Sequence, residues 1–381
     1  MRLIVSAGGT GGHVYPALTV VKFLLEPKPA GSGLPTLTSD DVLWIGSRSG
    51  MEAEMVPRAG IQFIGLAAGG LRGMGPWVTL RNAARILSSV GRARRILARF
   101  KPDTVLITGG YACVAVTLAA WMQRTPVLIY LPDIVPGRAI QFLGRFATQI
   151  AVTSEESYHY FRREKVTVTG YPVRPHVYSL DKVQACEALG LDPEEKTLLV
   201  FGGSRGARSI NRALVAGLRD LLPVCQIVHI SGRLDTAWVS ASAKSLPGEM
   251  KGRYHHYTYL HNMPQALVAA DLVVARAGAA TLGELPAAGL PAVLVPYPHA
   301  GQHQDHNAEY MARSGAAWVL PDAELDEKLV STVLEVLNDE ESLNGMREST
   351  RAMARPDAAE AIAERLWLAA RRQVSETGIS P

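Results

Sequence analysis

At its amino terminus the chain reads LIVSAGGTGGH from Leu3 to His13, and the helical pattern Ala17–Leu25 follows. The middle of the chain repeats this arrangement as LLVFGGSRGAR from Leu198 to Arg208. In both stretches an apolar strand enters a glycine-rich turn, where glycine lets the backbone bend tightly and approach an anion. The helix that follows offers free N–H groups and the positive end of its dipole. Two such units predict two α/β domains of the Rossmann type, each with a turn suited to a phosphate group.

The two turns also exclude some nucleotide-binding classes. Neither ends in the Gly-Lys-Ser/Thr of a P-loop, which argues against ATP hydrolysis. A nicotinamide fold requires Gly-x-Gly-x-x-Gly and an acidic residue at the end of the second strand. The first turn has a different spacing, and the second expected strand ends in Gly46-Ser47-Arg48. One turn per domain fits a two-domain cleft that holds two phosphorylated ligands.

Short β-branched runs alternate with helical patterns in both halves, as in parallel sheets with crossover helices. The first half has expected strands at Leu3–Ser6, Val42–Ile45, Thr104–Thr108, Val127–Tyr130, Gln149–Thr153 and Lys165–Val168. The second half has them at Thr197–Phe201, Gln226–Ser231, Tyr254–Tyr257, Leu272–Ala275, Ala292–Pro296 and Ala317–Leu320. Two prolines in Gly170–Pro175 fit an interdomain connection. We predict an N-terminal domain over 1–170, a C-terminal domain over 171–355, and a terminal helix and tail over 356–381.

The composition agrees with two globular domains. The 381 residues are too many for one ordinary core. No apolar run reaches the ~20 residues of a membrane-spanning helix, and no signal-peptide core precedes the first turn. Three scattered cysteines, Cys113, Cys186 and Cys225, are expected to be buried thiols in a reducing cytosol.

The charge of the chain is uneven. Residues 1–172 hold 19 Lys/Arg and 10 Asp/Glu, a net charge of +9, while the remainder of the chain has a net charge of −5. A basic first half either indicates an anionic partner or serves only solubility. Eight of its basic residues and no acid fall within residues 72–101.

On a helix with ~100° per residue, five arginines of this segment form one stripe. The stripe comprises Arg81, Arg85, Arg92, Arg95 and Arg99, with Trp77, Leu80 and Leu87 beside it. The opposite face holds Ile86, Val90, Ala93 and Leu97, which we expect against a core, with Gly91 as a candidate break in the helix. Apolar anchors beside arginines suit an anionic membrane surface, where each basic residue contributes about 1 kcal/mol. A solvated helix face is the alternative, and nucleic-acid binding is disfavoured because no aromatic stacking platform accompanies the arginines.

A second functional signal reads RAGAATLGE from Arg276 to Glu284, directly after the apolar run Leu272–Ala275. Helical spacing puts Arg276, Thr281 and Glu284 on neighbouring faces of the first turns of the next helix. A carboxylate one turn into a helix can accept both hydroxyls of a ribose, while N–H groups at the helix start hold a diphosphate. A capped surface helix is the alternative reading for Glu284 alone.

Taken together, the motifs of the chain closely resemble the MurG family, the lipid-linked N-acetylglucosaminyltransferases of bacterial cell-wall synthesis in glycosyltransferase family 28. The resemblance runs nearly end to end and is carried by Gly8–Pro16, Gly109–Tyr111, Gly170–Arg174, Gly202–Arg208, Arg276–Glu284 and His303–Asn307. It implies a GT-B fold, in which two Rossmann-like domains with parallel sheets face a central cleft and the C-terminal helix packs back on the N-terminal domain. It also implies inverting transfer of N-acetylglucosamine from UDP-N-acetylglucosamine to a lipid-linked muramyl-pentapeptide, which converts lipid I to lipid II in peptidoglycan synthesis.

The resemblance assigns expected roles to individual residues. On the donor side, those near the diphosphate are Arg174, Ser204 and Thr281, those of the uracil pocket are Tyr259, Leu260 and Met263, and those at the sugar hydroxyls are His303 and Gln304. Glu284 is expected to bind the ribose hydroxyls. On the acceptor side, the turn residues Thr10, Gly11 and Gly12 are expected to face the acceptor diphosphate, with His13 near the reacting atoms.

The reaction needs a base for the acceptor hydroxyl and positive groups for the departing diphosphate. His13 is the candidate base, and the alternative is that it only orients the acceptor or its diphosphate. The chain contains no Asp-x-Asp pair, which favours a mechanism without metal or other cofactor that uses Arg174, Arg276 and helix dipoles.

One segment departs from the family pattern. Where the family typically reads His-Glu-Gln-Asn ahead of Pro-Gly, this chain reads Tyr130-Leu131-Pro132-Asp133 ahead of Ile134–Gly137. Asp133 either takes the polar role of the asparagine, or supplies an alternative base, or marks a related lipid acceptor.

Three other functions stay open at the level of sequence. They are a related GT-B glycosyltransferase with another lipid or polysaccharide acceptor, a UDP-N-acetylglucosamine epimerase, and a non-catalytic binding module. The leading prediction places the protein peripherally on the cytoplasmic face of a bacterial cell membrane, with cell-wall synthesis proteins as candidate partners.

Overall fold

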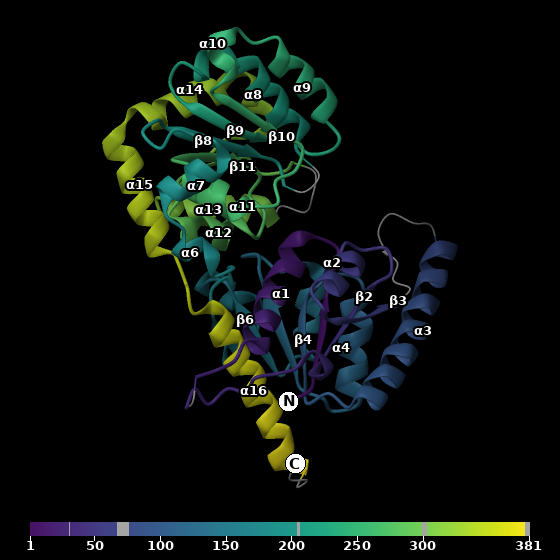
Figure 1. Cartoon of the computed structure of the whole chain (residues 1–381). Coiled ribbons are helices and arrows are strands. Elements are labelled where there is room, and N and C mark those ends of the chain that lie inside the picture. Colours follow the sequence, from purple (N-terminus) through teal and green to yellow (C-terminus); the bar gives the residue numbers. More distant parts are fainter. Residues whose placement is uncertain (30, 67–75, 204–205, 299–302, 378–381) are drawn as a thin grey trace. The chain divides into compact units, whose positions relative to one another are not determined.

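A computed structural model of the chain describes residues 1–29, 31–66, 76–203, 206–298 and 303–377, without the side chains of 76–87 and 372–377 (Figure 1). The chain divides into two compact units. The N-terminal unit comprises Met1–Pro172 and Asp357–Pro381, and the C-terminal unit comprises Val173–Pro356. The chain therefore leaves the N-terminal unit within the stretch of two prolines and returns to it at its end.

The N-terminal unit contains a seven-stranded sheet in the order β3-β2-β1-β4-β5-β6-β7, with every pair of neighbouring strands parallel. Its strands are β1 (Leu3–Ala7), β2 (Val42–Ser47), β3 (Gln62–Leu66), β4 (Thr104–Gly109), β5 (Val127–Leu131), β6 (Gln149–Val152) and β7 (Val166–Val168). The strand order reverses between β1 and β4, and ligands of such sheets bind outside the carboxyl ends of the strands at this point.

Helices cover both faces of this sheet. They are α1 (Gly11–Leu25), α2 (Glu52–Arg58), α3 (Pro76–Phe100), α4 (Ala112–Met122), α5 (Arg138–Leu143) and α16 (Ala358–Thr377). Alternate residues of β1 enter opposite cores, because Leu3 and Val5 belong to one buried cluster and Ile4 to another. Helix α16 contributes Ile362 and Leu366 to the first cluster and packs against α1, which confirms the expected return of the C-terminal helix (Figure 1).

The C-terminal unit repeats this plan with a six-stranded parallel sheet in the order β10-β9-β8-β11-β12-β13. Its strands are β8 (Thr197–Phe201), β9 (Gln226–Ile230), β10 (Tyr254–Tyr257), β11 (Leu272–Ala275), β12 (Ala292–Leu294) and β13 (Ala317–Val319). Its helices are α6 (His176–Ser179), α7 (Lys182–Leu189), α8 (Arg208–Leu221), α9 (Thr236–Lys244), α10 (Gly248–Lys251), α11 (Met263–Ala269), α12 (Thr281–Ala288), α13 (His303–Arg313), α14 (Leu325–Asn338) and α15 (Glu340–Ala352). The order reverses between β8 and β11, which are the strands before the second glycine turn and before Arg276.

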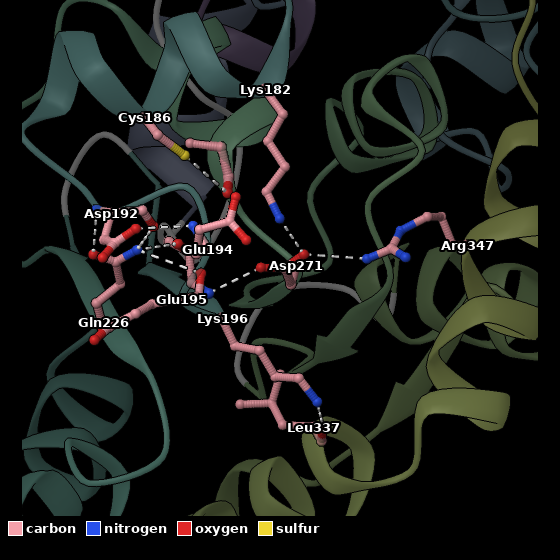
Figure 2. Close-up of polar contacts among 12 residues, drawn as sticks. Lys182, Cys186, Asp192, Glu194, Glu195, Lys196, Gln226, Asp271, Leu337 and Arg347 are labelled. Carbon is pink, nitrogen blue, oxygen red and sulfur yellow. Dashed lines mark hydrogen bonds and ion pairs between the residues drawn. The ribbon is translucent and has the colours of Figure 1, made fainter.

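Side chains close the amino ends of the strands in the C-terminal unit. Asp271 directly precedes β11, and its carboxylate accepts the backbone N–H of Thr197 at 2.9 Å. The same carboxylate contacts the Nζ of Lys182 at 2.6 Å and the Nη2 of Arg347 at 3.2 Å (Figure 2). Asp271 thus ties α7 and α15 to the start of the sheet and has a structural role, because the glycine turn lies at the opposite ends of the strands.

The two GT-B domains predicted from the sequence are confirmed, and every expected strand is present with its ends within two residues. The edge strand β3 was missed, because its sequence QFIGL is short and carries a glycine and an exposed Gln62. The candidate break at Gly91 is wrong, since α3 continues through it to Phe100. Ala93 and Leu97 are fully buried, as the arginine stripe on the other face of α3 requires. Within the described residues, no helix is long and apolar enough to cross a membrane.

Candidate active site

The first glycine turn is held against the end of β4. The N–H of Gly8 donates to the carbonyl of Gly109 at 3.0 Å. Gly9 and Gly110 have φ angles of +88° and +99°, which L side chains rarely adopt. A Cβ on Gly110 would also approach the carbonyl oxygen of Gly8 to 2.8 Å. The sequence needs glycine in both turns because the two backbones touch at the switch point of the sheet.

His13 lies in the first turn of α1, close to the other predicted acceptor residues. Its Nδ1 hydrogen-bonds the hydroxyl of Thr10 at 3.1 Å, and its carbonyl accepts the hydroxyl of Thr108 at 2.8 Å. The imidazole rests on Gly109, where a Cβ would come within 2.8 Å of Nε2. Gly11 and Gly12 begin α1, so their N–H groups have no partner inside the helix. The structure therefore brings Thr10, Gly11, Gly12 and His13 together at the carboxyl end of β1.

The segment Tyr130–Asp133, which differs from the family pattern, lies at the same edge of the sheet. Tyr130 is buried in β5, and its hydroxyl hydrogen-bonds Thr153 at 3.1 Å. Burial raises the pKa of Tyr130, the Thr153 hydroxyl opposes this shift, and the charge of Asp133 adds to it. Asp133 follows β5, which only β4 separates from β1. Strands β1 and β5 are thus about 10 Å apart, so both candidate bases emerge from the carboxyl edge of one sheet.

The donor residues of the C-terminal unit include one ion pair. Glu284 stands in the first turn of α12, and the Nη2 of Arg174 lies 3.7 Å from its Oε1. The side chains of Arg174 and Glu284 retain 32% and 19% of their exposure. Burial raises the pKa of Glu284, while the Arg174 guanidinium acts in the opposite direction. The pair that the sequence assigned to the diphosphate and the ribose is therefore assembled, with part of each group accessible to a ligand.

Arg276 is not on the helix where helical spacing had put it. Strand β11 ends at Ala275 and α12 begins only at Thr281, so Arg276 occupies the connecting loop. The expected position of Arg276 is wrong because a helical period does not reveal where a helix starts.

The guanidinium of Arg276 is largely occupied by the protein. It donates to Ser209 Oγ at 2.8 Å, pairs with Asp322 at 2.5 Å and lies over the ring of Tyr297 at 5.4 Å. It also donates to the carbonyls of Val295 and Pro296, at 3.3 and 3.2 Å. These contacts join the carboxyl ends of β11 and β12 to α8, so the structure gives Arg276 an organising position.

The remaining described donor residues lie around the ends of α11, α12 and α13. Thr281 donates its hydroxyl to the carbonyl of Gly278 at 2.6 Å, which fixes the start of α12. Gln304 accepts the N–H of Tyr297 at 3.0 Å, and His303 is the first residue of α13. These bonds connect described residues of the loops after β11 and β12 to the starts of α12 and α13, where phosphate and sugar groups were expected.

The predicted uracil residues follow the edge strand β10. Tyr259 is 44% exposed and meets His261 edge-to-face with ring centroids 4.9 Å apart. Leu260 is half-buried, and the half-buried Met263 begins α11. Helix α11 packs against both α6 and α12, so Met263 begins a helix that contacts the helix following Arg174 and the helix that carries Glu284.

Some predicted residues fall outside the description. Ser204 of the second turn is among the residues not described, and the side chains of Trp77, Leu80, Arg81 and Arg85 are likewise not described although their backbone forms α3.

Three arginines of the predicted membrane stripe, Arg92, Arg95 and Arg99, border a groove. Arg92 and Arg95 are exposed on α3 and line a groove of about 480 Å³ between this helix and the starts of β2 and β3. Arg2, Arg99 and Phe100 complete its rim. The described part of the stripe therefore forms one basic surface, at the ends of the strands opposite to the first turn.

Sequence reasoning missed one buried carboxylate beside the first turn. Glu52 is 1% exposed, and its two oxygens accept the N–H groups of Gly9 and Ser47 at 3.2 and 2.8 Å. Gly46 and Gly50 flank this side chain, and this spacing was the available signal.

Comparison with known proteins places these features in one family. The profile of the Glycosyltransferase family 28 N-terminal domain matches residues 3–152, and that of the Glycosyltransferase family 28 C-terminal domain matches residues 197–362. A UDP-N-acetylglucosamine--N-acetylmuramyl-(pentapeptide) pyrophosphoryl-undecaprenol N-acetylglucosamine transferase from Roseiflexus sp. (strain RS-1) is 40% identical to this chain. That match covers 98% of the chain and 97% of the relative.

Solved structures agree with the sequence matches. The crystal structure of Acinetobacter baumannii MurG is 26% identical and superposes with a TM-score of 0.74, covering 96% of this chain and 99% of that one. A UDP-GlcNAc 2-epimerase from Neisseria meningitidis, 16% identical with a TM-score of 0.65, covers 96% of this chain and 100% of its own and shares the fold alone.

Proposed function

The chain belongs to glycosyltransferase family 28, and we propose that it transfers N-acetylglucosamine from UDP-N-acetylglucosamine to a muramyl-pentapeptide carried on pyrophosphoryl-undecaprenol. The observation that carries this proposal is the match to transferases of that name over nearly the whole of both chains. Similarity confined to one domain would support a proposal for donor binding alone or for acceptor binding alone. Here both family 28 domains match, so one chain has the parts for both substrates.

The C-terminal unit is proposed to bind the donor. The Glu284 carboxylate would accept the two ribose hydroxyls, and the nearby Arg174 would then turn its charge toward the diphosphate. Their separation of 3.7 Å is longer than that of a direct charge-assisted hydrogen bond, so a ligand displaces little when it enters. Arg276 would act indirectly, because its bonds to Ser209 and Asp322 hold the loop ends that face the diphosphate.

The N-terminal unit is proposed to bind the acceptor and to supply the base. The free N–H groups at the start of α1 would hold the acceptor diphosphate, close to His13. His13 would take the proton of the acceptor hydroxyl while that oxygen displaces UDP from the α-linked sugar with inversion to a β-linkage. No step of this scheme requires a metal ion or another cofactor.

The arginine face of α3 is proposed to hold the protein on the cytoplasmic surface of the membrane that contains the lipid acceptor. Arg92, Arg95 and Arg99 project from one side of the helix, and Ala93 and Leu97 bury the other side. Cations arranged in this way attract anionic lipid headgroups at the membrane surface.

A related acceptor is the second candidate, and the segment Tyr130–Asp133 favours it. Asp133 places a carboxylate where the family typically has an asparagine amide, at the edge of the sheet that carries His13. A carboxylate accepts hydrogen bonds but donates none when ionised, so it would select different acceptor hydroxyls or amides.

The proposal is tested by incubating the protein with labelled UDP-N-acetylglucosamine and the purified undecaprenyl pyrophosphoryl muramyl-pentapeptide. We expect a labelled lipid-linked disaccharide and equimolar UDP, and no product with Glu284→Ala at donor concentrations that saturate the unchanged protein. Transfer to a different polyprenyl acceptor alone would favour the second candidate. Conversion of UDP-N-acetylglucosamine without any acceptor would indicate an epimerase and overturn both.

A further inference from the structure

A buried acidic side chain, that of Glu52, contacts the first glycine turn. Glu52 is the first residue of α2 and is 1% exposed, although ionised carboxylates are rarely buried without partners. Its Oε1 accepts the N–H of Ser47 at 2.8 Å, and its Oε2 accepts the N–H of Gly9 at 3.2 Å. One carboxylate thus connects the turn after β1 to the end of β2.

Three glycines make room for this side chain. A Cβ on Gly8, Gly46 or Gly50 would approach the Glu52 side chain closer than 3.0 Å. These glycines come from three different parts of the chain: the first turn, the end of β2 and the residues before α2. Their common feature is the space that they leave for one carboxylate, so the position of Glu52 is specified by its surroundings.

The carboxylate changes which N–H groups of the turn can bind an external anion. A glycine turn of this kind normally points its N–H groups at a phosphate. Here the N–H of Gly9 already donates to Glu52, and a second anion at that position would meet the Glu52 charge. The N–H groups at the start of α1, those of Gly11 and Gly12, stay available, and the helix dipole favours an anion there.

We infer that Glu52 is a positioning residue that fixes the first glycine turn and directs the acceptor diphosphate to the start of α1, beside His13. This inference rests on the proposed function, since it concerns the acceptor side of the same reaction. Glu52 is too buried to touch the substrate, so its effect passes through Gly9 and Ser47.

The test is the variant Glu52→Gln, with Glu54→Gln as its matched control. Glutamine has nearly the same size but only one acceptor oxygen, so it leaves the N–H of either Gly9 or Ser47 facing an amide NH2 group. Glu54 lies two residues further on the same helix, is 70% exposed and pairs with Arg58. Both variants remove one negative charge from α2, but only the first disturbs the turn.

For Glu52→Gln we expect the KM for the lipid acceptor to rise about tenfold, with the KM for UDP-N-acetylglucosamine and the Kd for UDP unchanged. Amide hydrogen exchange of the peptide that contains Gly9 should become faster in the variant without any substrate. Glu54→Gln should match the unchanged protein in all of these measurements. If Glu52→Gln does not fold, Glu52→Asp serves in its place, because it keeps the charge but shortens the reach to Gly9, and the same split of KM values is expected.

Unchanged acceptor KM and exchange in Glu52→Gln would overturn the inference, and so would a lower acceptor KM, which would mean that the carboxylate only repels the diphosphate. An equal rise in the KM values for donor and acceptor would also overturn the inference, because it would assign Glu52 a general structural role. Failure of the unchanged protein to form product would instead contradict the proposed function, and the hydrogen-exchange comparison would still test the turn.

Discussion

The two glycine turns look alike in sequence but are supported in different ways. The first is held from beneath by an acidic side chain, because the Glu52 carboxylate takes the N–H of Gly9. The second is linked through Arg208 to the carboxylate of Asp235, which also accepts from a buried amide side chain. Asn211 is fully buried in α8 and donates to the carbonyl of Ser231 and to the carboxylate of Asp235, both at 2.9 Å. A Cβ on Gly206 would come closer than 3.0 Å to that same Ser231 carbonyl.

Only one assignment of donors and acceptors satisfies all the hydrogen bonds around Asn211. Its amide nitrogen donates to Ser231 and Asp235, so its oxygen accepts from the Nε2–H of His229 at 3.0 Å. The Nδ1 of His229 then accepts the hydroxyl of Tyr254 at 2.6 Å. Burial lowers the pKa of His229 to about 3, so this ring stays neutral at physiological pH.

The charges near the two turns therefore differ. Asp235 is neutralised by the Arg208 guanidinium at 2.8 Å, whereas Glu52 accepts the backbone N–H groups of Gly9 and Ser47. A glycine turn alone indicates an anion site, and the groups behind it decide where the anion can sit. This difference agrees with an acceptor diphosphate displaced to the start of α1 and a donor diphosphate that approaches the second turn.

The largest effect should come from the base beside the first turn. His13→Ala should lower kcat by about 10²–10⁴-fold, because it removes the proposed acceptor of the hydroxyl proton. Donor KM should be unchanged, since Glu284 and Arg174 belong to the other unit. Steady-state kinetics with both substrates measure this, and Asp133→Asn is the matched comparison. A larger kcat loss for Asp133→Asn would transfer the role of base to Asp133.

Removing the carboxylate that is proposed to bind the ribose tests the donor side separately. Glu284→Gln should raise the Kd for UDP about a hundredfold, because charge-assisted hydrogen bonds to two hydroxyls are lost. Acceptor KM should change little. Calorimetric titration with UDP measures the effect, and the exposed Glu335→Gln in the same unit is the control. Equal UDP affinity in Glu284→Gln and Glu335→Gln would remove Glu284 from the donor site.

The amide behind the second turn should matter for folding as well as for binding. Asn211→Ala removes one buried hydrogen bond each from His229 Nε2, the Ser231 carbonyl and the Asp235 carboxylate. We expect the free energy of unfolding to fall by about 2 kcal/mol, accompanied by weaker UDP binding. Denaturant unfolding of this variant and of Asn344→Ala, an exposed substitution, provides the comparison. A loss no larger than that of Asn344→Ala would show that the network does not support the turn.

The pH dependence of donor binding should report the partial burial of Glu284. Because burial raises its pKa, Glu284 takes up a proton at a higher pH than an ordinary glutamate, and UDP affinity should fall as the pH falls through that value. A raised pKa in the folded state means that protonation favours folding, so this loss of affinity should occur without unfolding of the C-terminal unit. UDP titrations from pH 7 downward should show a several-fold decrease that Glu284→Gln lacks. Parallel pH profiles for the two proteins would contradict this explanation.

The smallest effect is expected on membrane binding by the arginine stripe of α3, which is separate from both glycine turns. Arg92→Ala should weaken binding to vesicles with anionic lipids about fivefold, at about 1 kcal/mol per basic residue, and leave UDP binding unchanged. Vesicle co-sedimentation at two salt concentrations measures this. Reversal of the stripe with Arg81, Arg85, Arg92 and Arg95→Glu should abolish binding, and vesicle binding that survives it would disprove the membrane role of α3.

Much of the fold was predictable because local chemistry determines it. The strands before both turns are β-branched or apolar runs, and the glycines mark where each strand must end. The start of α12 was not predictable, because Arg276 fits a helical period although the chain forms a loop until Thr281. Strand β3 was missed because its partner β2, rather than its own sequence, makes it a strand.

The candidate site was predictable only in its parts. The resemblance identified Arg174 and Glu284, which the structure pairs at 3.7 Å. Gly46 and Gly50 lie close to Glu52 in the sequence, but its bond to the first turn was not predictable, because Gly8 and Gly9 are more than 40 residues away and meet it only in the folded sheet. The same holds for Asn211, whose partners lie on β9 and in the loop after it.

The central claim is that the two turns serve two different phosphorylated ligands. Amide hydrogen exchange of the whole protein, with and without saturating UDP, tests it most directly. We predict slower exchange in peptides that cover the second turn, Gly202–Arg208, and the start of α12, with no change in the peptide that covers Gly8–His13. UDP protection of Gly8–His13 with none at Gly202–Arg208 would contradict the division of donor and acceptor between the two turns.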